Sequence, residues 1–219
     1  MFNRKTKKYI KNYISKDLPK NDFYDGKFTY LSNKFRSKII KDYQSARKLY
    51  KILEGISDKR DLLRLECKIQ IILYASIQEA VLSWVLFRYF KSTTEVKNLF
   101  ESKVLKRYSI PITKLNTISS SLKHDGKDII PCFETIQKRG KEKIRFDSKV
   151  KAALSLGIIS NKMCEDLIAI YEYRNTVHVE AEIKKQIKYD LEMSELAYRK
   201  VEGLDIELTK YFNEHKNRL

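Results

Sequence analysis

The sequence is poor in residues that break helices and in residues that bind metals or form disulfides. Its 219 residues include only six glycines, three prolines, three histidines and three cysteines. So few glycines and prolines favour long helices over a sheet of many strands. Cys67, Cys132 and Cys164 are an odd number with no C-x-x-C pair, which argues against a disulfide scaffold and a zinc site. We therefore expect a cytoplasmic protein without a metal ion or other cofactor.

Acidic residues are scarce relative to basic ones. The chain has 28 Asp and Glu against 45 Lys and Arg, which gives a formal net charge of +17. This excess favours a polyanionic partner, with nucleic acid first and an anionic membrane surface second. The competing interpretation is a lysine-rich surface that only contacts solvent.

Long uninterrupted apolar runs are also missing. The most apolar stretch, from Ile69 to Phe87, contains Gln70, Gln78 and Glu79. A charge and two amides near its middle predict a buried helix, and so no membrane partner. The first residues of the chain are charged and lack the apolar core of a signal peptide.

What the sequence does contain is helical periodicity. Apolar residues recur every three or four positions over most of the chain. Helices are expected over residues 32–56, 58–91, 94–106, 147–156, from 161 onward and from 179 to the C-terminus. No alternating strands of useful length are expected. The pattern predicts an all-α bundle of about four long helices with short helices attached.

We expect a single domain over residues 1–219, with two additions to its bundle. Residues 1–32 form a basic N-terminal helical arm, which either packs on the body or contacts phosphates. Residues 107–144 are the least regular part and are expected to form an insertion lying over the bundle. This insertion includes a turn at His124-Asp125-Gly126.

The segment Tyr173-Arg174-Asn175-Thr176-Val177-His178 concentrates polar groups suited to phosphate chemistry. In a continuous helix, Arg174 and His178 would be an i, i+4 pair on one face. They would extend the apolar stripe of Met163, Leu167 and Ile170, which places them at the rim of the bundle. Glu79, within the apolar helix, is expected either to pair with Arg174 or to face a solvent-exposed strip.

These residues can support cleavage of RNA by its own 2′-hydroxyl without a metal. His178 can act as acid or base, Arg174 can bind phosphate oxygens in a bidentate manner, and Asn175 can orient either group. No G-x-S-x-G elbow, P-loop or G-x-G-x-x-G is present to suggest another chemistry. Because each chain offers one such histidine, a homodimer would supply both the acid and the base.

Arg174 to His178, together with the preceding helix Asn161 to Tyr173 and Leu156-Gly157-Ile158-Ile159, resembles the signature region of HEPN domains. The spacing is the close form, R-N-x-x-H. The stretch Ile77-Gln78-Glu79-Ala80 is similar to the HEPN helix that carries a supporting acidic residue. The resemblance covers residues 33–106 and 145–217.

The resemblance implies a metal-independent endoribonuclease with a site formed across a homodimer. Arg174, Asn175 and His178 would be catalytic, with Glu79 and Tyr173 in support. It also implies a toxin or phage-defence effector that acts on RNA and works with an antitoxin or another defence-system protein. Two alternatives stay open: a non-catalytic HEPN-like module that binds RNA or protein, and a helical scaffold in which Arg174 pairs with Glu79 structurally.

Overall fold

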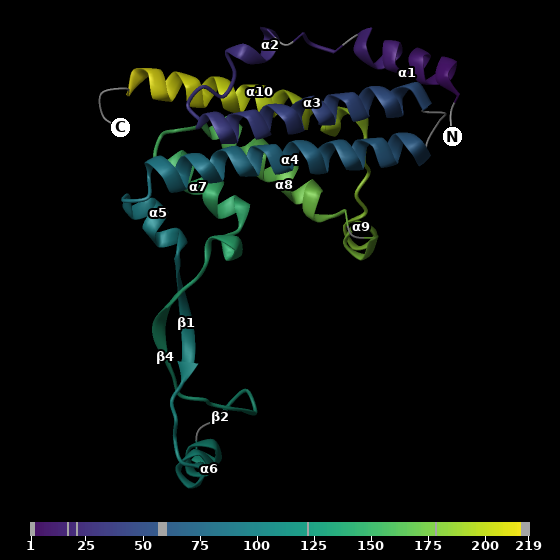
Figure 1. The fold of residues 1–219 in the computed structure, drawn as a ribbon. Coiled ribbons are helices and arrows are strands. Elements are labelled where there is room, and N and C mark those ends of the chain that lie inside the picture. The colour runs from purple at the N-terminus through teal and green to yellow at the C-terminus, as the bar shows by residue number, and fades with distance from the viewer. Residues whose placement is uncertain are drawn as a thin grey trace. The chain divides into compact units, whose positions relative to one another are not determined.

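A computed structural model describes residues 3–16, 18–20, 22–56, 61–121, 123–177 and 179–215. Its helices are α1 (Arg4–Lys16), α2 (Asp22–Asp25), α3 (Asn33–Ile56), α4 (Asp61–Tyr89), α5 (Thr94–Leu99), α6 (Ile112–Ser121), α7 (Phe146–Ser155), α8 (Asn161–Asn175), α9 (Val179–Lys185) and α10 (Leu191–Glu214). The strands are β1 (Glu101–Arg107), β2 (Lys123–His124), β3 (Lys127–Asp128) and β4 (Cys132–Lys138). The predicted all-α bundle is confirmed (Figure 1).

The chain divides into two compact units. The first consists of Met1–Val96 and Arg145–Leu219, and the second is Lys97–Ile144. The candidate site residues all belong to the first unit. The insertion expected at 107–144 lies within the second.

Helix α4 is the central helix of the first unit. It runs antiparallel to α3, and α10 packs along it on another side (Figure 1). Apolar side chains fill the space between these helices, among them the fully buried Ile71 and Leu82. The two glutamines that interrupt the apolar run are buried and bound to backbone carbonyls. Gln70 donates to Ala46 at 3.3 Å, and Gln78 donates to Ala197 at 2.8 Å.

The segment Leu62–Tyr89 of α4 is long and apolar enough to cross a membrane. In its most apolar window, however, 56% of the residues are buried against the rest of the first unit. That burial is typical of the core helix of a soluble bundle, because a spanning helix presents its apolar side chains to lipid.

From Val179 to His215, where the described residues end, the chain forms two helices and not the single long helix that we expected. Helix α9 ends at Lys185, and Gln186 has a positive φ of 50°. Helix α10 then begins anew, because the side chain of Asp190 caps it by accepting a hydrogen bond from the Met193 amide at 3.0 Å. Asp is a preferred N-cap residue for this reason.

Gly203 lies inside α10. A Cβ at this position would be 3.0 Å from the terminal methyl group of Met163 in α8. The glycine therefore lets α8 and α10 approach closely, and this packing offsets its low helix propensity.

In the second unit, our expectation that no strands of useful length form was wrong. The helix expected to reach Lys106 ends at Leu99, and the chain continues as strand β1. Strand β1 pairs with β4 in antiparallel register from Glu101↔Lys138 to Arg107↔Cys132. The partner strand begins more than twenty residues later in the sequence, so the periodicity of a single window does not reveal the pairing.

Hydrogen bonds from Arg139 join the end of β4 to the start of β1. The Arg139 amide donates to the Phe100 carbonyl at 2.9 Å. The Arg139 guanidinium donates to the carbonyls of Leu99 at 2.8 Å and Glu101 at 2.9 Å.

The turn expected at His124-Asp125-Gly126 connects β2 and β3, and Asp125 and Gly126 both have positive φ there, as in hairpin turns of type I′.

Within the expected N-terminal arm, α1 lies against the C-terminal end of α3. The Tyr13 hydroxyl donates to Glu54 at 3.0 Å. Gly55 leaves room for the ring, since a Cβ there would come within 2.8 Å of Tyr13.

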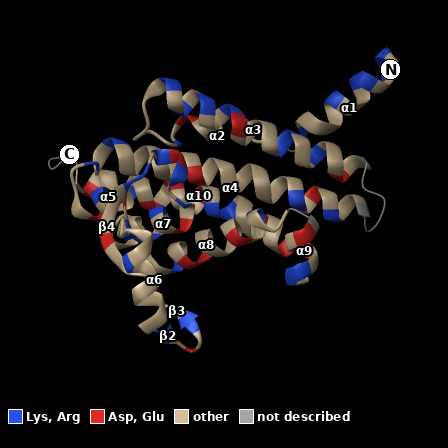
Figure 2. Ribbon diagram, turned by 90° about the horizontal axis from the view of Figure 1, so that it is seen from below, with Lys and Arg blue, Asp and Glu red and all other residues tan. Residues whose placement is uncertain are grey.

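Elsewhere Lys and Arg are spread along the helices with Asp and Glu between them (Figure 2). Charge alone therefore does not locate a binding site on the bundle.

Candidate functional site

Tyr173, Arg174 and Asn175 lie at the C-terminal end of helix α8. Ser160 caps the helix by accepting a hydrogen bond from the Met163 amide at 3.2 Å. The predicted stripe is confirmed, because Met163, Leu167 and Ile170 are all buried. Arg174 follows in the last turn and is half-buried. The stripe thus ends where the helix emerges from the core.

The helix does not continue to His178, which corrects our expectation of one helical turn. It ends at Asn175, and Thr176 and Val177 form a turn. The Thr176 hydroxyl donates to the Tyr173 carbonyl at 2.8 Å, which satisfies one of the carbonyls left free at a helix end. Arg174 and His178 are therefore not an i, i+4 pair of a continuous helix. His178 itself lies outside the described residues.

Thr176 and Tyr189 fix this end of α8. Thr176 is 2% exposed, and its hydroxyl and that of Tyr189 are 2.9 Å apart. The Tyr189 hydroxyl also donates to the Tyr173 carbonyl at 3.3 Å, and the two tyrosine rings pack edge to face with centroids 6.3 Å apart. Tyr173, predicted as a supporting residue, thus contacts the cap through its ring and its carbonyl.

Arg174 and Asn175 contact each other at the exposed edge of this cap. The guanidinium Nη1 of Arg174 donates to the Asn175 side-chain oxygen at 3.1 Å. The guanidinium also lies over the ring of Tyr171, 5.8 Å from its centroid. Within the described ranges, no carboxylate forms an ion pair with Arg174. Its positive charge and remaining N–H groups are thus available to an anion.

Glu79 pairs with Lys149 and not with Arg174, so the first of the two alternatives that we gave for Glu79 is wrong. Its Oε1 atom lies 3.2 Å from the Lys149 ammonium, which comes from α7. The Glu79 side chain is 30% exposed, whereas that of Lys149 is 7% exposed. A lysine is seldom this buried without a partner. The sequence contains no pattern that links α4 to Lys149, so this pair was missed.

Replacing Glu79 with alanine should destabilise the bundle by about 1–3 kcal/mol, because it leaves the Lys149 ammonium buried without its carboxylate. Adding Lys149→Met should recover most of that loss, since the unpaired charge is then removed. Urea unfolding followed by Trp84 fluorescence measures both effects. If Lys149→Met restores nothing, the cost of Glu79→Ala does not arise from the pair.

Glu182 ties α9 to α4 immediately after the candidate motif. The Arg64 Nε donates to Glu182 at 3.0 Å, and the Lys68 ammonium pairs with the other carboxylate oxygen. Glu182 is 6% exposed. The Lys68 ammonium also lies 4.8 Å from the centroid of the Tyr189 ring. The chain is therefore anchored on both sides of position 178, by Thr176 before it and by Glu182 and Tyr189 after it.

The hydrogen bonds from Lys68 and Arg64 lower the pKa of Glu182 below its usual value. A lowered carboxyl pKa stabilises the folded state above the ordinary value near 4.5, and this contribution is lost as the pH falls through the folded pKa. Glu182→Gln should therefore be less stable than wild type at pH 7, and the difference should shrink below about pH 4.5. Thermal melts across this range test the effect. A difference that stays constant with pH would contradict it.

The chain matches no protein-family model, no curated protein and no solved structure. The class that its fold defines is an all-α helical bundle. In the described part of the chain, no three His, Cys, Asp or Glu side chains are grouped to hold a metal ion. What this bundle does therefore has to be argued from the residues at the end of α8.

Proposed function

We propose that the protein is a metal-independent endoribonuclease of HEPN type. The observation that supports this most is the end of α8, where Arg174 and Asn175 contact each other at an exposed, capped helix end directly before His178. Glu79 pairs with Lys149 and is not proposed to contact Arg174, which has no carboxylate partner among the described residues. The net charge of +17 suits a polyanionic substrate.

In this proposal Arg174 binds the oxygens of the scissile phosphate through two parallel N–H donors. Asn175 orients the guanidinium through the 3.1 Å hydrogen bond. His178 of one copy takes the proton from the 2′-hydroxyl, whose oxygen attacks phosphorus. A second His178 gives a proton to the 5′-oxygen that leaves, so the products are a 2′,3′-cyclic phosphate and a 5′-hydroxyl.

The second histidine is proposed to come from a second copy of the chain. A two-fold dimer places the same surface of both copies face to face, and this is the commonest oligomeric arrangement. Two Arg174 side chains would then line one cleft and attract the RNA backbone. The resemblance to HEPN proteins extends the proposal to a toxin or phage-defence effector, restrained in the cell by an antitoxin or another defence-system protein.

The direct test is to incubate the purified protein with total RNA in excess EDTA. We expect cleavage products that end in 2′,3′-cyclic phosphate, and we expect Arg174→Ala to remove them. Arg88→Ala is the matched control, because it deletes the same charge from an exposed position on α4 and should cleave as wild type does. Equal cleavage by the Arg174→Ala protein would refute the proposed site.

Because Arg174 has no carboxylate partner among the described residues, a second function is also supported. In this second proposal the protein is a module that binds RNA without cleaving it. A guanidinium without a carboxylate partner can hold phosphate in either case. If wild type binds RNA, cleaves none of it, and loses affinity in Arg174→Ala, the binding module is the correct function. Light scattering of the wild-type protein separately tests the expected dimer.

A further inference from the structure

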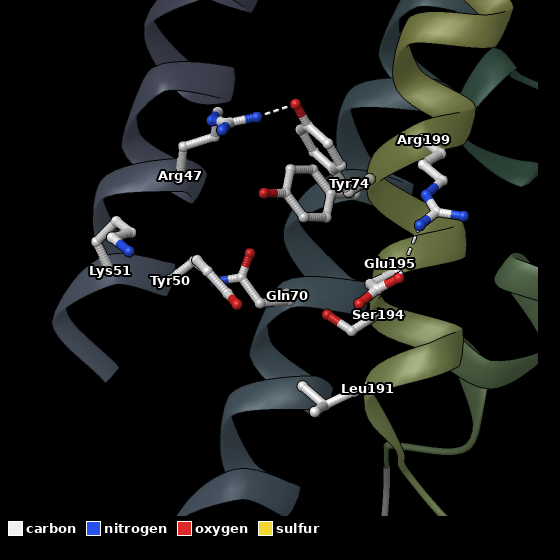
Figure 3. A pocket seen from close by; sticks show the side chains of 10 residues that line it. Arg47, Tyr50, Lys51, Gln70, Tyr74, Leu191, Ser194, Glu195 and Arg199 are labelled. Carbon is white, nitrogen blue, oxygen red and sulfur yellow. Dashed lines mark hydrogen bonds and ion pairs between the residues drawn. The ribbon is translucent and has the colours of Figure 1, made fainter. Parts of the chain in front are cut away.

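A hollow of about 310 Å³ lies between α3, α4 and α10 in the first unit (Figure 3). It shares no residue with the candidate site at the end of α8. Small-molecule pockets have volumes of roughly 300–1,000 Å³ and combine apolar walls with a few polar groups. The size of this hollow thus suits one small ligand, and its lining indicates which kind.

Three cations surround the hollow, and Arg47 is the one best suited to an anion. Lys51 pairs with Glu54, and Arg199 pairs with Glu195 at 2.9 Å. Arg47 instead lies over the ring of Tyr198, 4.6 Å from its centroid, and donates to the hydroxyl of that residue. In the described part of the chain it has no carboxylate partner. Its remaining N–H donors can therefore bind a phosphate.

Aromatic rings form much of the wall. Tyr74 is 3% exposed and packs against Tyr198 with centroids 5.5 Å apart. Tyr50 is half-buried and stands at the edge of the hollow, beside Gln70 (Figure 3). The half-buried Tyr50 ring offers an apolar surface against which a planar base can pack, whereas Tyr74 forms part of the wall behind it. A simple phosphate or a sugar phosphate would leave this surface unused.

Gln70 and Ser194 are polar residues in the lining of the hollow, and the Gln70 side-chain oxygen is buried without a hydrogen-bond partner among the described residues. The Ser194 side chain is in a residue only 6% exposed, and its hydroxyl points from α10 toward the hollow (Figure 3). The Gln70 amide nitrogen is used by Ala46, whereas its oxygen is unpartnered. Buried polar groups are normally satisfied. The Gln70 oxygen is therefore open to a donor from a ligand, and the Ser194 hydroxyl faces the same hollow.

We propose that this hollow binds a nucleotide. Arg47 binds the phosphate, the base lies against Tyr50, and the Ser194 hydroxyl bonds to a polar edge of the base or to a ribose hydroxyl. The Glu195 carboxylate at the rim can accept from the ribose as well. The nucleotide is either a free ribonucleoside monophosphate or one unit of an RNA strand, because both present the same groups. This inference does not depend on cleavage at Arg174.

Isothermal titration calorimetry tests the proposal with the intact protein. The four ribonucleoside 5′-monophosphates, inorganic phosphate and a 2′-O-methyl pentanucleotide, which cannot be cleaved through its 2′-oxygen, serve as titrants. We expect at least one monophosphate or the pentanucleotide to bind, and Arg47→Gln to weaken that binding at least about 10-fold. Lys41→Gln removes the same charge from an exposed position on α3 and should leave the affinity within about twofold. Tighter binding of the pentanucleotide assigns the site to RNA, and otherwise it is assigned to the free nucleotide.

Ser194→Val is the second variant, since Arg47 also packs on Tyr198 and its loss could unfold the bundle. The added methyl groups enter the hollow and remove the hydroxyl, so the same ligand should again bind at least about 10-fold more weakly. Trp84 fluorescence melts establish that each variant is folded. The proposal is overturned if no monophosphate and no pentanucleotide binds, if Ser194→Val binds as wild type does, or if inorganic phosphate binds as tightly as the monophosphates.

Discussion

His178→Ala should slow the cleavage of RNA by roughly 100- to 10,000-fold, the usual contribution of general acid–base catalysis. Under the proposed mechanism each site uses two copies of this side chain, one to accept and one to donate a proton. The variant removes both at once, so the effect should lie toward the upper end. Initial rates on a fluorescent oligoribonucleotide in EDTA measure it.

The matched control for this variant is His124→Ala, which deletes the same group from an exposed turn of the second unit. It should leave the rate unchanged. The wild-type rate should also fall on both sides of a maximum between about pH 5 and 8, where histidines titrate. A His178→Ala protein that retains the wild-type rate would show that the histidine takes no part in catalysis.

Tyr43→Ala should lower the free energy of unfolding of the bundle by about 3–5 kcal/mol, as expected for the loss of a large buried ring. Tyr43 is fully buried, and its ring lies between those of Tyr24, Tyr74 and Tyr198, with centroids 5.9 to 6.1 Å away. It therefore joins α3 to α2, α4 and α10. Its removal leaves a cavity where these helices meet.

Tyr43→Phe is the control that separates the ring from its hydroxyl. The hydroxyl donates to Glu202 at 3.0 Å, and burial raises the pKa of Tyr43 well above its usual range, so it remains a donor. The variant should lose only about 1 kcal/mol, because Glu202 keeps the Tyr198 hydroxyl at 3.1 Å. Trp84 is the single tryptophan and lies in α4; its fluorescence during urea unfolding reports on the first unit. Equal losses in both variants would contradict a packing role for the ring.

Helix ends that depend on a capping residue or a glycine next to the helix were predictable from the sequence. Ser160 caps α8, and Gly157, with a φ of 69°, lies in the turn after α7; both residue types are common at such positions. The features that were missed depend on partners distant in sequence. Strand β1 forms because β4 pairs with it, and no local periodicity encodes that pairing.

At the candidate site, sequence reasoning located the residues but not their contacts. The spacing of Met163, Leu167 and Ile170 correctly directed Arg174 to the end of a buried stripe. It could not show that α8 stops at Asn175, because the stop depends on Thr176 meeting Tyr189 from the next segment. The partner of Glu79 was missed for the same reason, since Lys149 is seventy residues away along the chain.

The hydrogen bonds between Arg139 and residues 99–101 bear on how the chain can gain, lose or replace its second unit. They hold the beginning and the end of the second unit next to each other, and segments with adjacent ends can be inserted or removed with little disturbance to their host. A tight turn in place of the hairpin would leave the sequence of the first unit intact on both sides. Residues 97–144 can thus vary in length or be replaced by another segment while the bundle keeps its core.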